Sequence, residues 1–293
     1  MKKILVLCLL CVSAIVRGDY SEHAKAQSVI DTLIDKHGFT SEEVKAVLGL
    51  ANTEQRILDS MANAAEKTKT WTEYKASFLR ESRIAKGAEF LHKHSALFKR
   101  AEQEYGVTPA VITAILGVET NYGSYTGKAS VLDALATLAF DHPRRGKFFR
   151  SELVEYIVLC REQGWEPAEQ LGSYAGAMGM TQFMPSNYRK LAVDGNADND
   201  VNLFIVEDAI PSVANYLRHH GWEAGALVAT RAAVHEDFDE SVIGRGLKPN
   251  ATVSQLESAG YFGQRKLNSQ QKARVVRFND ADGDEFWLGL QNF

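Results

Sequence analysis

The stretch PAVITAILGVETNYG, residues 109–123, decides how the middle of the chain folds. Its proline suits the first turn of a helix, and the apolar run that follows predicts a helix ending near the asparagine. Ile112, Ile115 and Glu119 share one face of that helix. Burial beside apolar neighbours and the negative end of the helix dipole would both raise the pKa of Glu119. The pattern therefore predicts a carboxylic acid suited to general acid catalysis.

The residues around Glu119 favour a catalytic role over the alternative, an ordinary carboxylate that reaches solvent or pairs with an arginine. NYGSYTG, residues 121–127, is a loop of aromatic and amide groups that suits a sugar surface. GSYAGAMGMTQFMPS, residues 172–186, has glycines that permit close backbone approach and lacks the lysine of a phosphate-binding loop. A tight helix–loop–helix packing site remains the alternative for this second stretch.

Composition indicates a soluble globular protein with one large domain or two modest ones. The chain has 293 residues, of which 45% are hydrophobic and 24% are charged. Lysine and arginine number 33 and aspartate and glutamate 37, so the net charge is −4. This balance disfavours a protein that binds nucleic-acid phosphates, and no nucleic-acid partner is expected.

The first eighteen residues have the form of a secretory signal peptide. A short basic start precedes an apolar run at residues 4–16, which is too short to span a membrane. We expect an exported protein whose mature chain begins at Asp19. A lipid anchor is not expected, because leucines precede Cys8 and Cys11 where lipidation requires a small residue. Cys160 would then be the only cysteine, which excludes an intrachain disulfide.

The order of sequence patterns predicts a mainly α fold of the α+β class. Residues 19–105 form an N-terminal helical region. Residues 106–225 form a second helical region, which turn-rich loops interrupt. Residues 226–293 form a small β-rich region with strands near residues 226–230, 274–278 and 286–290, where β-branched and aromatic runs alternate with glycine and aspartate clusters.

Four motifs resemble the membrane-bound lytic transglycosylase B family, glycoside hydrolase family 103. They are ILGVETNYG (115–123), PRRGKFF (143–149), GSYAGAMGMTQFMPSNY (172–188) and DAIPSVANYLRHHGW (208–222). The resemblance runs from about residue 70 to the C-terminus. It implies a lysozyme-like core at residues 106–225 that cleaves peptidoglycan in the periplasm, with Glu119 as the catalytic acid. The saccharide-contacting residues that it implies are Tyr122, Arg144, Ser173, Tyr174, Gln182 and Phe183.

The expected mechanism needs one carboxylate and no catalytic cofactor. An ordinary glycoside hydrolase uses a second carboxylate, and only folding could bring Asp133 or Asp141 near Glu119. The resemblance implies instead that Glu119 protonates the β-1,4 oxygen between N-acetylmuramic acid and N-acetylglucosamine. Glu119 then accepts a proton from the muramic C6 hydroxyl, which attacks C1 and gives a 1,6-anhydromuramyl end. Gln182 and Ser173 would hold the N-acetyl and ring substituents.

The acidic stretch DGNADND, residues 194–200, resembles the opening of a calcium-binding EF-hand loop. Asn199 replaces the usual glycine, and Ile205 replaces the usual terminal glutamate. The resemblance implies a longer loop that ends in Asp208, and we expect structural Ca²⁺ in the loop 194–208. An Asx-rich surface turn is the alternative. The predicted ligands are Asp194, Asn196, Asp198, Asp200 and Asp208.

The resemblance is incomplete at the C-terminus. The family continues past a segment like FWLGLQNF into a further strand and helix, whereas this chain ends at Phe293. We therefore expect an open saccharide groove or an unpaired sheet edge. The alternatives to a lytic transglycosylase are a hydrolytic muramidase, an inactive peptidoglycan-binding protein and a Ca²⁺-dependent scaffold. The expected partners of a monomer are glycan strands and, for a scaffold, other cell-wall enzymes.

Overall fold

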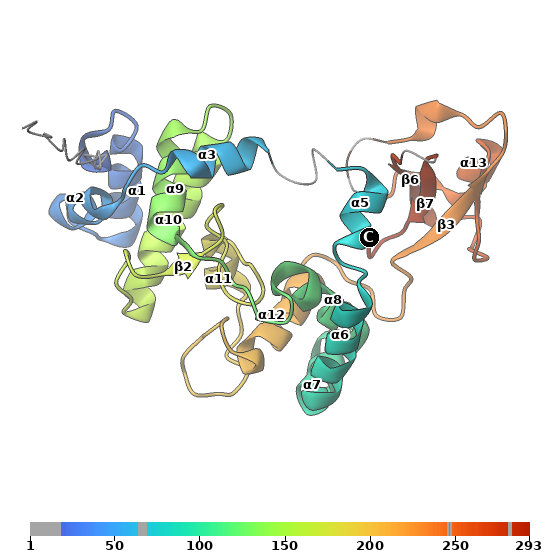
Figure 1. Ribbon diagram of the computed structural model, residues 1–293, viewed down its shortest axis with the longest axis horizontal. Coiled ribbons are helices and arrows are strands. Elements are labelled where there is room, and N and C mark those ends of the chain that lie inside the picture. The colour runs from blue at the N-terminus through green and yellow to red at the C-terminus, as the bar shows by residue number, and fades with distance from the viewer. Residues whose placement is uncertain (1–18, 64–68, 245, 247, 281–282) are drawn as a thin grey trace, which may run out of the picture.

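The computed structural model describes residues 19–63, 69–244, 246, 248–280 and 283–293. The expected signal peptide, residues 1–18, lies outside the described residues. Helices make up most of the structure, and a five-stranded sheet lies at one end, so the predicted mainly α fold with a β-rich part is confirmed. Figure 1 shows α1 (Gln27–His37) and α2 (Ser41–Leu50) at the end opposite the sheet.

Helices from two separate stretches of the chain share the first hydrophobic core. Leu33 and Leu48 from the N-terminal stretch are buried in one cluster with Leu135 and Tyr156 from the middle of the chain. Thr40 begins the second of these helices with a capping box, as its spacing to a glutamate predicts. The helices are α1 (Gln27–His37), α2 (Ser41–Leu50), α3 (Gln55–Ala62), α9 (Val131–Asp141) and α10 (Gly146–Gln163).

A second core lies among helices that flank the predicted catalytic segment. Phe98, Leu116 and Ile210 are buried there. The predicted helix is confirmed: its proline stands at the first position, and it ends where Asn121 takes a left-handed conformation with φ of 51°. The helices are α6 (Glu81–Lys93), α7 (Ser95–Tyr105), α8 (Pro109–Thr120) and α12 (Val206–His219).

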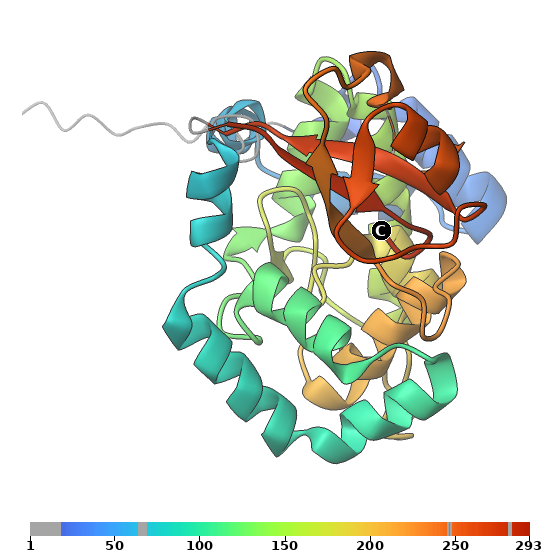
Figure 2. The same cartoon turned by 90° about the vertical axis from the view of Figure 1, so that its right-hand side faces the viewer.

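The sheet is antiparallel and has the strand order β4-β6-β7-β3-β5. The predicted strands are β3, β6 and β7, while β4, β5 and the short helix α13 (Val253–Ser258) complete the unit. Strand β7 lies between β6 and β3, so the last described strand is internal to the sheet. In Figure 2 the sheet faces the viewer. The strands are β3 (Ala229–Val234), β4 (Ala251–Thr252), β5 (Tyr261–Gly263), β6 (Lys272–Phe278) and β7 (Glu285–Gly289).

Helix α5 (Trp71–Ala76) joins the sheet to the rest of the molecule. The Trp71 backbone N–H donates to the Asn279 carbonyl at 3.1 Å, and the Trp71 ring stacks on Phe278 with centroids 4.1 Å apart. Lys75 forms an ion pair with Glu285 of β7. The aromatic contact and the ion pair therefore fix the sheet beside the helical part.

Short elements shape the loops next to α8. Strand β1 (Ala129–Ser130) pairs with β2 (Leu171–Gly172), and α11 (Pro185–Leu191) follows. The buried carboxylate of Glu152 in α10 accepts hydrogen bonds from the Ser186 N–H at 3.0 Å and hydroxyl at 2.7 Å. Cys160 is buried as a free thiol. None of the described helices has the length and apolarity needed to cross a bilayer.

Candidate active site

Glu119 lies on the wall of a cleft of about 410 Å³. Three parts of the chain meet there: helix α3, the end of α8 with the loop that follows it, and the loop 172–184. The predicted site residues Ser173, Tyr174 and Gln182 line the same cleft as Glu119. The structure therefore brings four of the seven predicted catalytic and saccharide-contacting residues together.

The end of α8 is fixed by Thr120, the neighbour of Glu119. Thr120 is buried, and its hydroxyl donates to the Met180 carbonyl at 3.0 Å. The same oxygen accepts the Gly123 N–H at 3.0 Å. One side chain thus joins the helix, the loop that follows it and the loop 172–184. Glu119 is held at a defined position relative to Gln182 on that second loop.

The Glu119 carboxylate is desolvated although its side chain has an exposed surface. A residue on a concave wall has both properties, because solvent reaches its surface while surrounding protein displaces bulk water. Burial raises the pKa of Glu119 above its usual value of 4.5. The Glu119 carboxylate has no hydrogen bond or ion pair with the described residues, and it is the only acidic group among those that line the cleft.

Asp133 and Asp141, the two candidates for a second catalytic carboxylate, lie outside the cleft. Asp133 accepts the backbone N–H of Asn52 at 2.7 Å, at the start of α9. Asp141 accepts the Tyr20 hydroxyl at 2.5 Å, at the end of the same helix. Neither is among the residues of the cleft wall. The cleft thus lacks the second carboxylate of an ordinary glycoside hydrolase among its described residues.

Ser173 and Gln182 present hydrogen-bonding groups to the cleft. The Ser173 hydroxyl oxygen accepts the N–H groups of Ala175 at 3.3 Å and Ala177 at 3.0 Å. Its own O–H then remains a donor. Gln182 has a positive φ of 50°, and its amide donates to the Thr126 carbonyl at 3.1 Å. A second donation goes to the Gly179 carbonyl at 2.9 Å, which leaves the amide oxygen as an acceptor.

The loop after α8 approaches the β1–β2 pair closely. Gly127 has φ of 102°, and a Cβ atom there would lie 2.0 Å from the Gly172 carbonyl oxygen. Only glycine therefore fits at this position. The approach brings Tyr125, whose side chain is exposed, to the same cleft as Tyr174.

Three predicted saccharide-contacting residues lie outside this cleft. Tyr122 packs between α6 and α8, and its hydroxyl donates to the Arg83 carbonyl at 3.1 Å. Phe183 is buried against Tyr216, with ring centroids 5.2 Å apart. Arg144 is exposed in the turn before α10. Saccharide contact by these three residues stays a prediction.

Four polar residues of the cleft wall are not among the predicted site residues. Tyr125 lies in the aromatic loop 121–127, whose composition is typical of a sugar-binding surface. Lys128 follows that loop, and no sequence motif marks it as a site residue. Arg56 and Ser60 of α3 are distant in sequence from every motif. Only the packing of α3 against α9 brings them to the cleft.

The acidic loop 194–208 folds around its own backbone. The Asp194 carboxylate accepts the N–H groups of Ala197 at 2.7 Å and Asn199 at 2.9 Å. Asn199 takes the left-handed conformation expected at its position, with φ of 69°. The carboxylate of Asp208, which is fully buried, accepts the N–H groups of Gly195 at 2.8 Å and Asn202 at 2.6 Å.

The charges of this loop nevertheless suit a hard cation. Burial raises the pKa of Asp208, and the negative charges of Asp194 and Asp198 add to the effect. Among the described residues, no three acidic, histidine or cysteine side chains converge closely enough to hold a metal ion. The oxygen donors fit the chemistry of Ca²⁺, but ligation would require them to converge.

Comparison with known proteins gives consistent matches. A family model described as Transglycosylase SLT domain matches residues 21–293. The Escherichia coli (strain K12) membrane-bound lytic murein transglycosylase B is 37% identical over 285 residues, which cover 94% of this chain and 78% of that protein.

Solved structures extend the likeness to the fold. The Escherichia coli lytic transglycosylase Slt35, in complex with calcium, has a TM-score of 0.82 and 37% identity, covering 94% of this chain and 87% of that one. The Pseudomonas aeruginosa protein SltB3, in complex with NAG-NAM-pentapeptide, has a TM-score of 0.76 and 26% identity, covering 91% and 72%. The chain belongs to the Transglycosylase SLT domain family, and it is a lytic transglycosylase, an enzyme that cleaves glycosidic bonds of peptidoglycan.

Proposed function

We propose that this enzyme cleaves the β-1,4 bond between N-acetylmuramic acid and N-acetylglucosamine and leaves a 1,6-anhydromuramyl end. Glu119 acts first as the general acid and then as the general base. The observation that carries the proposal is that Glu119 is the only carboxylate among the described residues of the cleft wall, and that its pKa is raised by burial.

The raised pKa supports the first step. A larger fraction of Glu119 stays protonated near neutral pH, so it can donate to the glycosidic oxygen. The bond between C1 and that oxygen breaks, and the proton from Glu119 stays on the leaving hydroxyl. Glu119 is now a carboxylate close to an oxocarbenium-like sugar.

The absence of a second carboxylate among the described residues of the cleft wall supports the second step. With no further acid to position and ionise a water molecule, the muramic C6 hydroxyl serves as the nucleophile. Its oxygen forms a bond to C1, and its proton returns to Glu119. The enzyme is restored, and water is neither consumed nor released.

The polar groups around the cleft suit an N-acetylated sugar. The Ser173 O–H can donate to an acetamido carbonyl, and the Gln182 amide oxygen can accept from an acetamido N–H. Tyr125 and Tyr174 offer aromatic surface to the sugar rings. The contacts of Gln182 with two loops hold its amide in one orientation before the ligand arrives.

The test is product analysis in water enriched in oxygen-18. Purified peptidoglycan is digested, and the new muramyl ends are measured by mass spectrometry. We expect anhydro ends with no heavy oxygen from the wild-type chain and no products from Glu119→Gln. Reducing ends that carry one heavy oxygen would identify a hydrolytic muramidase instead. Binding without products from the wild-type chain would identify an inactive peptidoglycan-binding protein.

We also propose that Ca²⁺ binds the loop 194–208 in a structural role. The support is the oxygen donor set of Asp194, Asn196, Asp198 and Asp208 and the raised pKa of Asp208. A cation would relieve the mutual repulsion of these carboxylates. Asp200 would add its backbone carbonyl as a further ligand, at the next position of the alternating pattern 194, 196, 198 and 200. No residue of this loop is among the described residues that line the cleft with Glu119, so removal of the ion would affect stability before chemistry.

The proposed substrate lies outside the cytoplasmic membrane, which agrees with export of the chain. The form of residues 1–18 supports a secretory signal peptide and a periplasmic location. Cell fractionation with an antibody against the mature chain tests this directly. Recovery in the cytoplasmic fraction alone would contradict it.

A further inference from the structure

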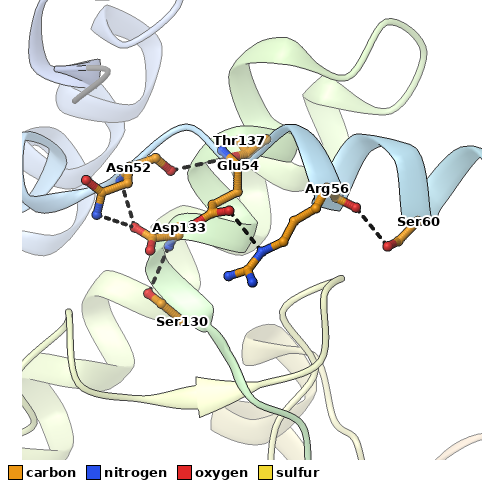
Figure 3. A network of polar contacts seen from close by, with 7 residues as sticks. All are labelled: Asn52, Glu54, Arg56, Ser60, Ser130, Asp133 and Thr137. Carbon is orange, nitrogen blue, oxygen red and sulfur yellow. Dashed lines mark hydrogen bonds and ion pairs between the residues drawn. The ribbon is translucent and has the colours of Figure 1, made fainter. Parts of the chain in front are cut away.

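Arg56 is a cation on the wall of the cleft that holds Glu119. It lies in the first turn of α3, and Ser60, one turn later, lines the same cleft. The Arg56 side chain is 73% exposed, so its charged group is accessible to a ligand. Figure 3 shows it projecting from the α3 ribbon on the side where Glu54 and Ser130 lie.

A network of polar contacts fixes the backbone that carries Arg56. The Asn52 N–H donates to Asp133, and the Glu54 N–H donates to the Thr137 hydroxyl at 3.1 Å. Asp133 in turn accepts from Asn52 while its own N–H donates to the Ser130 hydroxyl at 3.2 Å. The segment that leads into α3 is thus bound to α9 (Figure 3), and α9 follows the short strand β1, whose first residue Ala129 lines the cleft.

The guanidinium of Arg56 is oriented by a single contact. Its Nε atom lies 2.9 Å from the Glu54 carboxylate, whose side chain is 29% exposed. The two terminal nitrogens have no hydrogen bond or ion pair within the described chain. A guanidinium held at Nε with two parallel N–H donors presented outward is the geometry that binds a carboxylate through two hydrogen bonds.

The charges of the cleft wall point the same way. The protein as a whole is net negative, yet the ionisable groups of this wall are Glu119, the tyrosines, Arg56 and Lys128. With Glu119 protonated for catalysis and Glu54 offsetting the charge of Arg56, Lys128 leaves the wall with a net positive charge. A neutral chitin-like glycan has no group that would use the two cations. A muramyl residue does, because it carries an acidic lactyl ether.

We propose that Arg56 is a specificity-determining residue that binds a carboxylate carried on the lactyl side chain of the muramyl unit. This inference rests on the proposed function and names the part of the substrate that distinguishes it from other N-acetylated glycans. The carboxylate has two sources: the lactyl group itself in peptide-free strands, or the stem peptide in peptide-bearing strands. Lys128 supplies a second, less directional charge on the same wall.

The experiment compares dissociation constants in a Glu119→Gln background, where turnover is blocked. Calorimetry is carried out with three ligands: an N-acetylglucosamine tetramer, a peptide-free NAG-NAM tetrasaccharide and the same tetrasaccharide with stem peptides. We expect Arg56→Gln to weaken binding of the acidic ligands roughly five- to thirtyfold. This is the effect of losing a hydrogen bond between charged groups at a site that solvent can still reach. Binding of the neutral tetramer should stay unchanged.

Two further variants separate recognition from general effects. Arg56→Lys keeps the charge but lacks the two parallel donors, so it should restore only part of the affinity. Arg80→Gln removes an exposed arginine that does not line the cleft and should leave all three affinities unchanged. The difference in dissociation constant for the acidic ligands between Arg56→Gln and its parent should also shrink as the salt concentration is raised, because salt screens exposed charges.

The comparison of the two acidic ligands also identifies whether Arg56 binds the lactyl carboxylate or a carboxylate of the stem peptide. A loss for both acidic ligands assigns both carboxylates, a loss confined to the peptide-free ligand assigns the lactyl carboxylate, and a loss confined to the peptide-bearing ligand assigns the stem peptide; each of these supports the proposal. Equal losses for all three ligands, or no loss for either acidic one, overturn it. Failure of the proposed function would appear separately, as reducing ends or no products from the wild-type enzyme.

Discussion

The hydroxyl of Thr120 donates to the Met180 carbonyl at 3.0 Å and so joins helix α8 to the loop 172–184. Thr120 is the residue next to Glu119, and Met180 lies two residues before Gln182. Thr120 is not expected to touch the substrate. Its hydrogen bond nevertheless sets the distance between Glu119 and Gln182, which are expected to touch it. The relationship makes Thr120 a positioning residue.

Replacement of Thr120 by valine should lower the free energy of unfolding by about 1–3 kcal/mol, because the Met180 carbonyl and the Gly123 N–H lose a buried partner. Turnover should fall while the fold persists. Urea denaturation and anhydro-product assays measure the two effects. Thr113→Val is the matched control, since the Thr113 hydroxyl bonds only within α8, to the Pro109 carbonyl. Equal losses in both variants would contradict a positioning role.

Glu119→Gln should abolish turnover by at least the ~10²–10⁴-fold typical of general acid–base catalysis. Glutamine has nearly the same shape but cannot donate and then accept the proton. Initial rates of anhydro-product release measure the loss. Glu102→Gln, an exposed residue of α7, serves as the control and should retain full activity. A Glu119→Gln enzyme with more than a tenth of wild-type activity would exclude Glu119 as the acid.

The raised pKa of Glu119 predicts that Glu119→Gln is more stable than wild type near neutral pH. The folded state binds the Glu119 proton more tightly than the unfolded chain, so wild-type stability falls as pH rises from the usual value of 4.5 through the raised pKa. Below 4.5 the two proteins should melt alike. Melting temperatures between pH 3.5 and 8 test this. A variant that is less stable than wild type near neutral pH would mean that the pKa of Glu119 is lowered.

The same titration predicts the pH dependence of the reaction. The first step requires the protonated acid, so kcat/KM should decline as pH rises through the raised pKa of Glu119. The declining limb should lie above the pKa of an ordinary glutamate. A rate that increases through this range would indicate that the ionised form is needed in the free enzyme.

Gln182→Ala should weaken catalysis by about 1–3 kcal/mol in transition-state stabilisation. The change removes an acceptor for the acetamido group. It also removes the two hydrogen bonds that the Gln182 amide donates to the carbonyls of Thr126 and Gly179. Gln182→Gly relieves the positive φ and therefore separates backbone strain from loss of the side chain. Unchanged turnover and unchanged affinity for N-acetylglucosamine oligomers would remove Gln182 from the site.

Calcium should stabilise the protein without changing the chemistry. With an affinity in the extracellular range of ~10⁻⁴–10⁻³ M, 10 mM Ca²⁺ should add about 1.4 to 2.7 kcal/mol. Thermal melting with Ca²⁺, with Mg²⁺ and with chelator measures this. Asp194→Ala should eliminate the calcium effect, whereas Glu102→Gln should keep it. Indifference of the wild-type protein to Ca²⁺ would leave the loop as an Asx-rich turn.

Elements that follow from local chemistry were predictable from the sequence. Helix α8 begins at its proline and ends at Asn121, and strands β3, β6 and β7 fall close to their expected positions. Strands β4 and β5 were not foreseen because they have two and three residues, too few to show an alternating pattern. Pairing with β6 and β3, rather than propensity, makes them strands.

The site was predictable where its residues belong to loops with a special backbone. Ser173 and Gln182 lie in a glycine-rich stretch, and folding brings that stretch to Glu119. Arg56 carries no such signal, because its place depends on the contacts that join α3 to α9 about 80 residues away. Tyr122 has the residue type of a sugar platform, yet its position after the end of α8 turns it toward α6. Tertiary packing decided both cases.

The sharing of each core by distant parts of the chain also limits how far the protein can be shortened from its C-terminal side. The cluster that holds α1 to α3 is completed only by residues as far along as Leu203, and the cluster that holds α8 needs residues up to Ala214. Contacts over such separations form late, after long loops have closed. A chain cut before Leu203 would lack members of both cores, so neither α3 nor α8 would have its full packing and the cleft between them should not form.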